Sequence, residues 1–133
     1  MTRRSVHSGS PWERSVAYCR AKRVGGMIVV SGTVAADAEG AVIAPGDVHG
    51  QARAALEKIE RALGELGATL SDVVRTRTYL TDMSRFEEFG RAHREVFEGI
   101  DPAATCVEVS RLVGPEFLVE IEVDAVVGEP DRP

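Results

Sequence analysis

An alternating segment near the end of the chain, residues 117–127, carries three carboxylates on one side. Glu120, Glu122 and Asp124 alternate with apolar residues, and this period of two is typical of a strand whose side chains point to opposite faces. Three acids in register repel one another, so we expect at least one of them to have a raised pKa. Glu120 could act as a catalytic carboxylate, but a simpler interpretation is that it is a polar residue at an interface between subunits.

The cysteines and His93 offer weaker chemistry. Cys19 and Cys106 lie far apart and match no metal-binding or redox spacing, and no neighbouring base in the sequence would make Cys106 a thiolate. His93 falls on the apolar side of an expected helix. A packed, hydrogen-bonded histidine is more common in such a place than a general base, so neither residue type predicts the catalytic group by itself.

The elements that must position these residues are recognisable by their periods. Residues 15–24 and 27–35 predict two strands of a hairpin, because the two glycines between them tolerate a tight turn. Tyr18, Arg20 and Lys22 would then share one face of the first strand. A short third strand is expected after the hairpin.

The middle of the chain predicts a helix followed by a strand. The short third strand lies within residues 37–47, and a helix then runs over residues 47–67, with Asp47 as N-cap and Gly67 in a left-handed C-terminal cap. Residues 72–80 alternate between apolar or threonine side chains and arginine or tyrosine, which predicts a strand.

The last third of the chain predicts a second helix and two strands. The helix covers residues 84–99, and Ser84 with Glu87 has the pattern of a capping box. Strands follow over residues 105–112 and 117–127, joined by a short turn. The acids of the last strand are expected to lie beside Cys106 on one face of the sheet.

These elements follow the order β-β-β-α-β-α-β-β, which predicts an α+β fold with two helices on one face of a mixed sheet. The other face is neither plainly core nor plainly solvated, so a second subunit is expected to cover it, most simply in a closed ring of copies. We expect a single domain over residues 1–133, with a core over 11–127 and a frayed tail over 128–133.

Composition excludes several functional classes. Sixteen basic and twenty-one acidic residues give a net charge of −5, which disfavours nucleic-acid binding because such binding needs a basic patch. No apolar run is long enough to span a membrane, and the first residues lack the apolar region of a signal peptide. Two cysteines without a disulfide pattern are most simply free thiols in a reducing compartment, so we expect a cytoplasmic protein. From the charge and the lack of a long apolar run we expect no nucleic-acid and no membrane partner.

The motifs "VSGTVA", "VVRTRTYLTD" and "DPAATCVEVSRL…LVEIEVDAVV" resemble the Rid family of reactive-intermediate deaminases, also called YjgF-like or L-PSP endoribonuclease proteins. The resemblance covers residues 11–127. It implies a chorismate-mutase-like fold, a homotrimer with clefts between subunits, and hydrolysis of an enamine or imine such as 2-aminoacrylate to a keto acid and ammonia. It also implies no metal and no cofactor, because the imine carbon is already electrophilic.

The family's site residues map onto this chain with two losses. Glu120 matches the carboxylate that holds the attacking water. Ala104 stands where the family has an arginine that grips the substrate carboxylate, and Gly90 stands where it has an asparagine. The expected substrate-binding residues are Tyr18, Ser31, Gly32, Gly90, Ala104, Thr105 and Cys106. The chain therefore resembles a divergent member that keeps the water-handling part of the site.

The missing arginine shapes the functional expectation. A hydrogen bond to a charged group contributes about 1.5–3 kcal/mol, so its loss should weaken capture of a small imino acid by roughly ten- to a hundredfold. We expect hydrolysis of an uncharged or larger imine in a wider, more apolar pocket. Arg20, Arg77 and His93 are candidates for a substitute role. The alternatives are a trimer that binds a ligand or partner without catalysis and, with less support, RNA cleavage.

Overall fold

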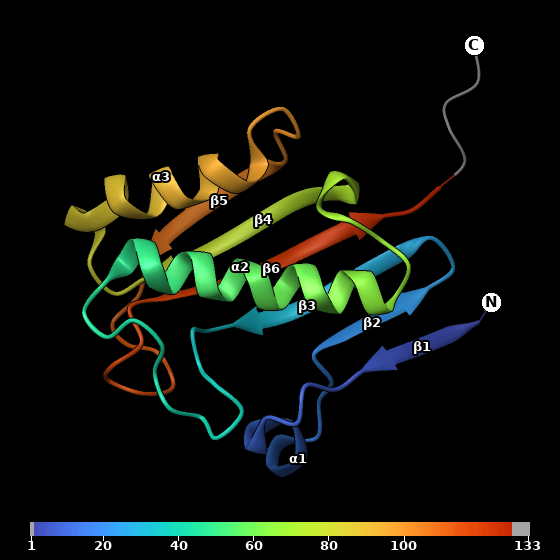
Figure 1. Ribbon diagram of the computed structural model, residues 1–133, viewed down its shortest axis with the longest axis horizontal. Helices are drawn as coiled ribbons and strands as arrows, with labels where there is room; N and C mark the ends of the chain where they lie inside the picture. Colours follow the sequence, from blue (N-terminus) through green and yellow to red (C-terminus); the bar gives the residue numbers. More distant parts are fainter. Residues whose placement is uncertain (1, 129–133) are drawn as a thin grey trace.

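Two long helices lie across one face of a six-stranded sheet in the computed structural model, which describes residues 2–128 (Figure 1). The strands are β1 (Arg3–Val6), β2 (Ala21–Val24), β3 (Met27–Thr33), β4 (Val73–Leu80), β5 (Ala103–Glu108) and β6 (Val119–Val126). The helices are α1 (Pro11–Val16), α2 (Val48–Glu65) and α3 (Phe86–Phe97), with short 3-10 turns at Leu70–Asp72 and Met83–Arg85. The α+β fold class is confirmed.

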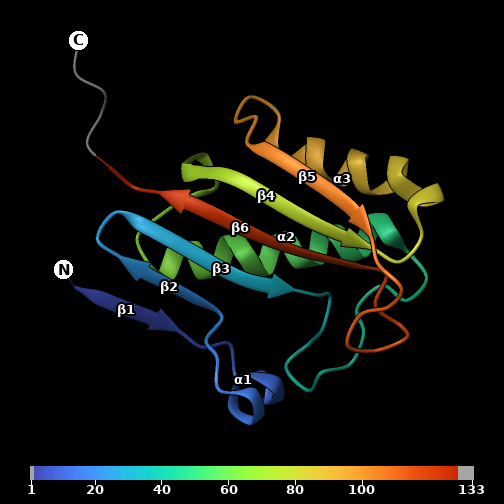
Figure 2. The same cartoon turned by 180° about the vertical axis from the view of Figure 1, so that it is seen from behind.

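The sheet is mixed, with the strand order β1-β2-β3-β6-β4-β5. Each described pair of neighbours is antiparallel except β4 and β5, which are parallel and connected through α3. A parallel pair needs such a crossover because its strands start at the same edge. Figure 2 shows the opposite face of the sheet, over which neither α2 nor α3 lies; we call it the open face.

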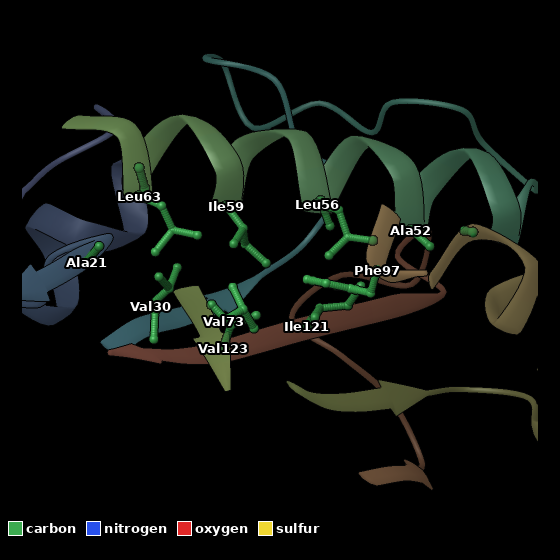
Figure 3. Packing of buried hydrophobic residues seen from close by; sticks show 14 of the residues in the cluster. Ala21, Val30, Ala52, Leu56, Ile59, Leu63, Val73, Phe97, Ile121 and Val123 are labelled. Atoms are coloured by element: carbon green, nitrogen blue, oxygen red, sulfur yellow. The ribbon is translucent and has the colours of Figure 1, made fainter. Parts of the chain in front are cut away.

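The core lies between α2 and the middle of the sheet (Figure 3). Leu56, Ile59 and Leu63 recur at helical spacing and pack toward Val30 and Val123, and all five side chains are at most 3% exposed. Burying a side chain of this size contributes about 1.5–3 kcal/mol. This layer fixes α2 on the two central strands, and through them it fixes the relative position of β3 and β6.

The ends of α2 agree with the prediction of a helix over residues 47–67. The Asp47 side chain accepts a hydrogen bond from the backbone N–H of Gly50 at 2.9 Å and so caps the first turn. After the helix, Gly67 has a φ of +81°, in the left-handed region that favours glycine. Sequence signals at both ends of this element were therefore sufficient.

The N-terminal region differs from expectation. The predicted strand over residues 15–24 is wrong in its first half, because α1 occupies its start and β2 begins only at Ala21. Pro11 stands in the first turn of α1, where its fixed φ suits a helix, and Ala17 ends the helix in a left-handed conformation at φ +71°. The unpredicted strand β1 pairs with β2.

Tyr18 and Arg20 consequently precede β2 and do not lie within a regular strand. Arg20 is 4% exposed, whereas Lys22 in β2 is exposed, so the two do not share a face as predicted. The period of two applies only once the strand has begun. This difference places a buried arginine where the sequence suggested a surface one.

Two further details of the predicted order are corrected. The strand expected within residues 37–47 is reduced to a single bridge between Ala36 and Val42. The last two strands are not joined by a short turn, because β5 ends at Glu108 and β6 starts at Val119, with β4 between them in the sheet. Residues 129–133 of the predicted tail lie outside the described residues.

The start of α3 is also capped differently. The predicted capping box of Ser84 and Glu87 is wrong, since Arg85 is the N-cap of α3 and makes no side-chain capping bond. Asp82 instead caps the preceding 3-10 turn by accepting from the backbone N–H of Ser84 at 3.0 Å. Within residues 2–128, no helix combines the length and apolar character that a membrane crossing requires.

Candidate functional site

A β-bulge in β3 prepares the first part of the candidate site. Between the pairs Val30–Val123 and Thr33–Ile121 the register shifts, so that Ser31 and Gly32 together face one residue of β6. A bulge of this kind bends the strand and re-aims its side chains, which is why bulges are common beside functional sites. We call Ser31, Gly32 and Glu120, with Tyr18 and Arg20 beside them, the bulge site.

Gly32 and Glu120 are in close contact. A Cβ atom placed on Gly32 would collide with the carboxylate oxygen of Glu120 and would lie 3.0 Å from its carboxyl carbon. Only glycine leaves this space free, so the backbone at position 32 forms one wall around the carboxylate. Gly32 and Glu120, which the sequence named separately as a substrate-binding and a catalytic residue, thus lie against each other in the structure.

Glu120 is partly buried, and burial is the main cause that raises its pKa above the ordinary carboxyl value. The positive charge of Arg20 lowers this pKa, and the negative charge of Glu122 raises it. The expected raised pKa therefore falls on Glu120, but the loss of water contact contributes more than repulsion among the acids.

Arg20 links the parts of the bulge site. Its guanidinium donates a hydrogen bond to the backbone carbonyl of Gly32 at 2.7 Å and lies 5.6 Å from the centre of the Tyr18 ring. The hydroxyl of Ser31 donates to the carbonyl of Cys19 at 2.8 Å, which holds the bulge against the segment before β2. Tyr18, Ser31 and Gly32 are thereby gathered around one buried cation.

The other two acids of β6 are occupied by neighbours on β4. Glu122 accepts a hydrogen bond from the hydroxyl of Tyr79, and this bond raises the pKa of Tyr79 above its ordinary value. Asp124 pairs with Arg77 at 3.3 Å. These contacts support a structural role for Glu122 and Asp124. Arg77 is paired with Asp124, so its contacts do not support the idea that it replaces the missing substrate-binding arginine.

The second part of the site is a pocket between α3 and β5, which we call the α3–β5 pocket. Its volume is about 670 Å³, within the range of small-molecule sites. The lining residues are Thr76, Thr78, Phe86, Phe89, Gly90, His93, Arg94, Phe97, Glu98, Asp101, Pro102, Ala104, Thr105 and Cys106. It therefore brings together Gly90, Ala104, Thr105 and Cys106, which the sequence placed in the substrate-binding set.

The positions of Ala104 and Gly90 leave room in this pocket. Ala104 is exposed, and a Cβ atom on Gly90 would meet only the edge of the Phe86 ring, at 3.9 Å. Cys106 is partly buried, and burial raises the pKa of its thiol, which does not favour a nucleophilic thiolate. The expected wider, apolar pocket is consistent with this lining.

His93 lies in the wall of the same pocket. Its Nε2 atom is 2.9 Å from the hydroxyl oxygen of Thr76, and its ring lies 5.5 Å from the ring of Phe89 and 4.7 Å from that of Phe97. Burial lowers the pKa of His93, so the imidazole is neutral at neutral pH. This packed, hydrogen-bonded state is the one that the sequence favoured over a general base.

Thr78 is a pocket residue that sequence reasoning missed. Its side chain is 1% exposed, and its hydroxyl oxygen is buried without a hydrogen-bond partner. Buried polar groups are normally paired, so this hydroxyl is an exception beside the pocket. The alternation over residues 72–80 contained the signal, because it placed the threonines on the face opposite the arginines.

The bulge site and the α3–β5 pocket lie on opposite faces of the sheet. Cys106 is in register with Thr78, whereas Glu120 is in register with Tyr79. Consecutive residues of a strand point to opposite faces, so Cys106 lies on the helix-covered face and Glu120 on the open face. The prediction that the acids lie beside Cys106 is therefore wrong, and one chain does not bring the two parts together.

Residues 2–128 contain no group of three or more histidine, cysteine, aspartate or glutamate side chains that is placed to hold a metal ion. The candidate site itself consists of a partly buried carboxylate and a largely apolar pocket.

Comparison with known proteins identifies the family. Residues 11–127 match the family described as Endoribonuclease L-PSP. A crystal structure of a YjgF/YER057c/UK114 family member from Mycobacterium tuberculosis is 48% identical, with a TM-score of 0.87 over 95% of this chain and 100% of that one. The YjgF gene product of E. coli is 27% identical, with a TM-score of 0.81 over 92% and 98% of the two chains. A RutC family protein from Pyrococcus abyssi is 38% identical over 81% of this chain and 84% of its own. The chain belongs to the Endoribonuclease L-PSP family, that of the YjgF-like proteins.

Proposed function

We propose that this chain forms a homotrimer that hydrolyses an imine or enamine metabolite in clefts between its subunits. The observation that carries the proposal is the separation of the candidate residues onto two faces of the sheet, with Glu120 on one and Cys106 on the other. A neighbouring copy that brings its bulge site to the α3–β5 pocket would complete a cleft with a carboxylate on one wall and an apolar pocket on the other.

In the proposed reaction, water adds to the electrophilic imine carbon while Glu120 accepts a proton from that water. That proton passes to the nitrogen and gives a carbinolamine; the carbinolamine hydroxyl then loses its proton and the nitrogen gains one through Glu120, so the C–N bond breaks and a carbonyl compound and an amine or ammonia leave. An enamine substrate first takes up a proton at carbon to become the imine. Burial raises the pKa of Glu120, and a carboxylate whose pKa is closer to the working pH is a more effective base. The reaction otherwise requires positioning and electrostatic stabilisation.

The pocket supports a substrate that is larger than 2-aminoacrylate or that lacks a carboxylate. Ala104 supplies no charge at the position where the family has an arginine, and the charged lining residues are the exposed Arg94, Glu98 and Asp101, two of which are acidic. An anionic substrate therefore gains little attraction here, whereas an apolar substituent would contact the rings along α3.

The reaction is tested with imines generated in place by an amino-acid oxidase acting on alanine, leucine or phenylalanine, and with an uncharged imine. The carbonyl product is followed against a buffer control. Glu120→Gln is expected to lower the rate by about 10²–10⁴-fold, because it removes the base. The matched variant Glu122→Gln should change it little, since Glu122 is engaged by Tyr79.

The oligomer is tested separately by light scattering during size-exclusion chromatography, which should give the mass of three chains. A monomer, or no rate above buffer with any imine tried, would contradict the proposal. So would equal losses in the two glutamine variants, because the effect would then not be specific to Glu120.

A non-catalytic trimer that binds a small ligand in the same cleft is the second candidate, and Ala104 favours it because binding needs no water-activating machinery. Glu120→Gln distinguishes the two, since binding would survive and turnover would not. RNA cleavage has less support: the net charge is −5, and the pocket histidine is held by Thr76. If protein freed of contaminating ribonucleases cleaved RNA, RNA cleavage would become the better supported function.

A further inference from the structure

A second, smaller cavity lies beside the C-terminal half of α2, apart from the α3–β5 pocket. Its volume is about 200 Å³. The lining residues are Val6, His7, Ser8, Arg20, Lys58, Arg61, Ala62 and Glu65. Three cations thus line one small cavity, in a chain whose net charge is −5. We call Arg20, Lys58 and Arg61 the cation cluster.

The cation cluster lacks the direct ion pairs that some arginines of this chain make. Arg53 pairs with Glu95 at 3.1 Å, and Arg77 pairs with Asp124 at 3.3 Å. Across residues 2–128, by contrast, no carboxylate oxygen lies within 4.0 Å of a charged nitrogen of Arg20, Lys58 or Arg61. The cluster therefore carries positive charge that no direct ion pair offsets.

Hydrogen bonds fix two of these cations in place. The Lys58 ammonium donates to the backbone carbonyls of Val34 at 3.2 Å and Ala36 at 3.1 Å. Arg20 is 4% exposed and donates to Gly32, yet its Nε atom is buried without a partner. Cations held in this way lose little freedom when an anion binds.

The acids near the cavity do not neutralise it by contact. Both carboxylate oxygens of Glu13 are engaged: one accepts from the Ser8 backbone N–H at 3.0 Å and lies 3.4 Å from His7, and the other accepts from the Ser8 hydroxyl. Glu65 lines the cavity but is exposed. The pKa of Lys58 is lowered, mainly by burial and next by the charge of Arg20, and Glu13 only partly opposes this.

We propose that the cation cluster binds a small oxyanion, namely phosphate or the carboxylate of a small metabolite. Guanidinium and ammonium groups bind such oxygens through charge-assisted hydrogen bonds, which are the stronger kind. A cavity of about 200 Å³ holds a group of a few heavy atoms, whereas drug-sized ligands occupy about 300–1,000 Å³. This site shares Arg20 with the bulge site of the proposed imine cleft, whereas Lys58 and Arg61 come from α2. Anion binding by the cluster does not require that the cleft hydrolyses imines.

The chain has two lysines, Lys22 and Lys58, which makes the test direct. Protein labelled with ¹³C at lysine Cε is titrated with inorganic phosphate, acetate or chloride at constant ionic strength and pH. The Lys58 signal should shift saturably and the Lys22 signal should not. Saturation with phosphate identifies a phosphoryl ligand, and saturation with acetate a carboxylate. No saturable shift with either anion, or a shift with chloride alone, overturns the proposal.

Variants then assign the site. Arg61 is exposed and is the safer change, so Arg61→Gln should weaken anion affinity at least tenfold while Lys58 still reports binding. Lys58→Gln should abolish binding measured by calorimetry, and Lys22→Gln, which removes the same charge outside the cavity, should not change it. Equal effects of Lys58→Gln and Lys22→Gln would show general charge attraction and overturn the site.

Discussion

The bulge site and the α3–β5 pocket are built in opposite ways. The bulge site is tightly bonded: Arg20 binds the carbonyl of Gly32, and Gly32 lies against the Glu120 carboxylate. The pocket is open, since Ala104 is exposed and Gly90 has space beside it. The bulge site therefore leaves no space for a larger side chain at Gly32, whereas the α3–β5 pocket has space for larger side chains at Gly90 and Ala104.

Under the proposed function, this difference would assign the chemistry to one part and the choice of substrate to the other. A carboxylate that acts on water needs a fixed position and a controlled pKa, and both depend on close contacts. A pocket that selects the substrate can exchange side chains without disturbing the core, because its walls include an exposed strand and one side of a surface helix. Ala104 and Gly90, the two positions at which the resemblance in sequence implies a lost side chain, both line this open part.

The sharpest test of the comparison replaces one glycine in each part by alanine. In Gly32→Ala, the new methyl group displaces the Glu120 carboxylate, so imine hydrolysis should fall about a hundredfold, the usual cost of a misplacement of about 1 Å. Stability should change by less than about 1 kcal/mol, because the displaced atoms end a flexible side chain. In Gly90→Ala, the helix should gain about 0.5–1 kcal/mol and activity should persist.

Rates and urea unfolding of both variants provide the measurements. A fully active Gly32→Ala variant would show that the contact between Gly32 and Glu120 has no part in the reaction. A Gly90→Ala variant that is destabilised would show that the pocket is less open than the contacts indicate.

The second test restores the missing cation to the open part. Ala104→Arg is expected to increase the rate with a small 2-imino acid by roughly ten- to a hundredfold, because a charge-assisted hydrogen bond then holds the carboxylate. The rate with the uncharged imine should fall as the pocket narrows. Ala103→Arg is the matched control, since Ala103 is in register with Arg75 and so faces the other side of β5.

Equal gains in Ala104→Arg and Ala103→Arg would indicate a general charge effect and would contradict the assignment of the pocket. A gain with the uncharged imine would do the same, because that substrate offers no carboxylate to the new arginine.

Sequence reasoning succeeded where a local pattern determines the structure. The helix that became α2 has its own cap, its own apolar spacing and its own terminal glycine, so its existence follows from neighbouring residues alone. The alternating motifs likewise placed Cys106 and Glu120 on strands, and the structure has them in β5 and β6. These features depend on few long-range contacts.

The errors concern relations between distant segments. The burial of Arg20 depends on a bulge twelve residues further along and on a strand, β1, with no strong pattern of its own. The placement of Cys106 away from Glu120 depends on β4 lying between β5 and β6. Periodicity gives the alternation of faces within a strand but not the pairing between strands, so neither relation could be read locally.

The smallest expected effect concerns the charge of Arg20 on Glu120. Burial raises the pKa of Glu120 above its ordinary value of 4.5. The folded protein therefore holds this proton more tightly than the unfolded chain does. Stability should consequently fall as the pH rises from about 4.5 through the folded pKa, and Glu120→Gln should remove this fall. Unfolding in urea across that pH range measures the difference.

Arg20→Met sharpens this prediction, because Arg20 is the group that lowers the pKa of Glu120. Without that charge the pKa should rise further, and the loss of stability should extend to higher pH. Carbon-13 NMR of the glutamate carboxyl groups follows the titration directly. Lys22→Met is the control, since it removes an exposed positive charge two residues away. If Glu120 titrates at the same pH in both variants, burial alone sets its proton affinity, and the buried arginine serves only to hold the bulge.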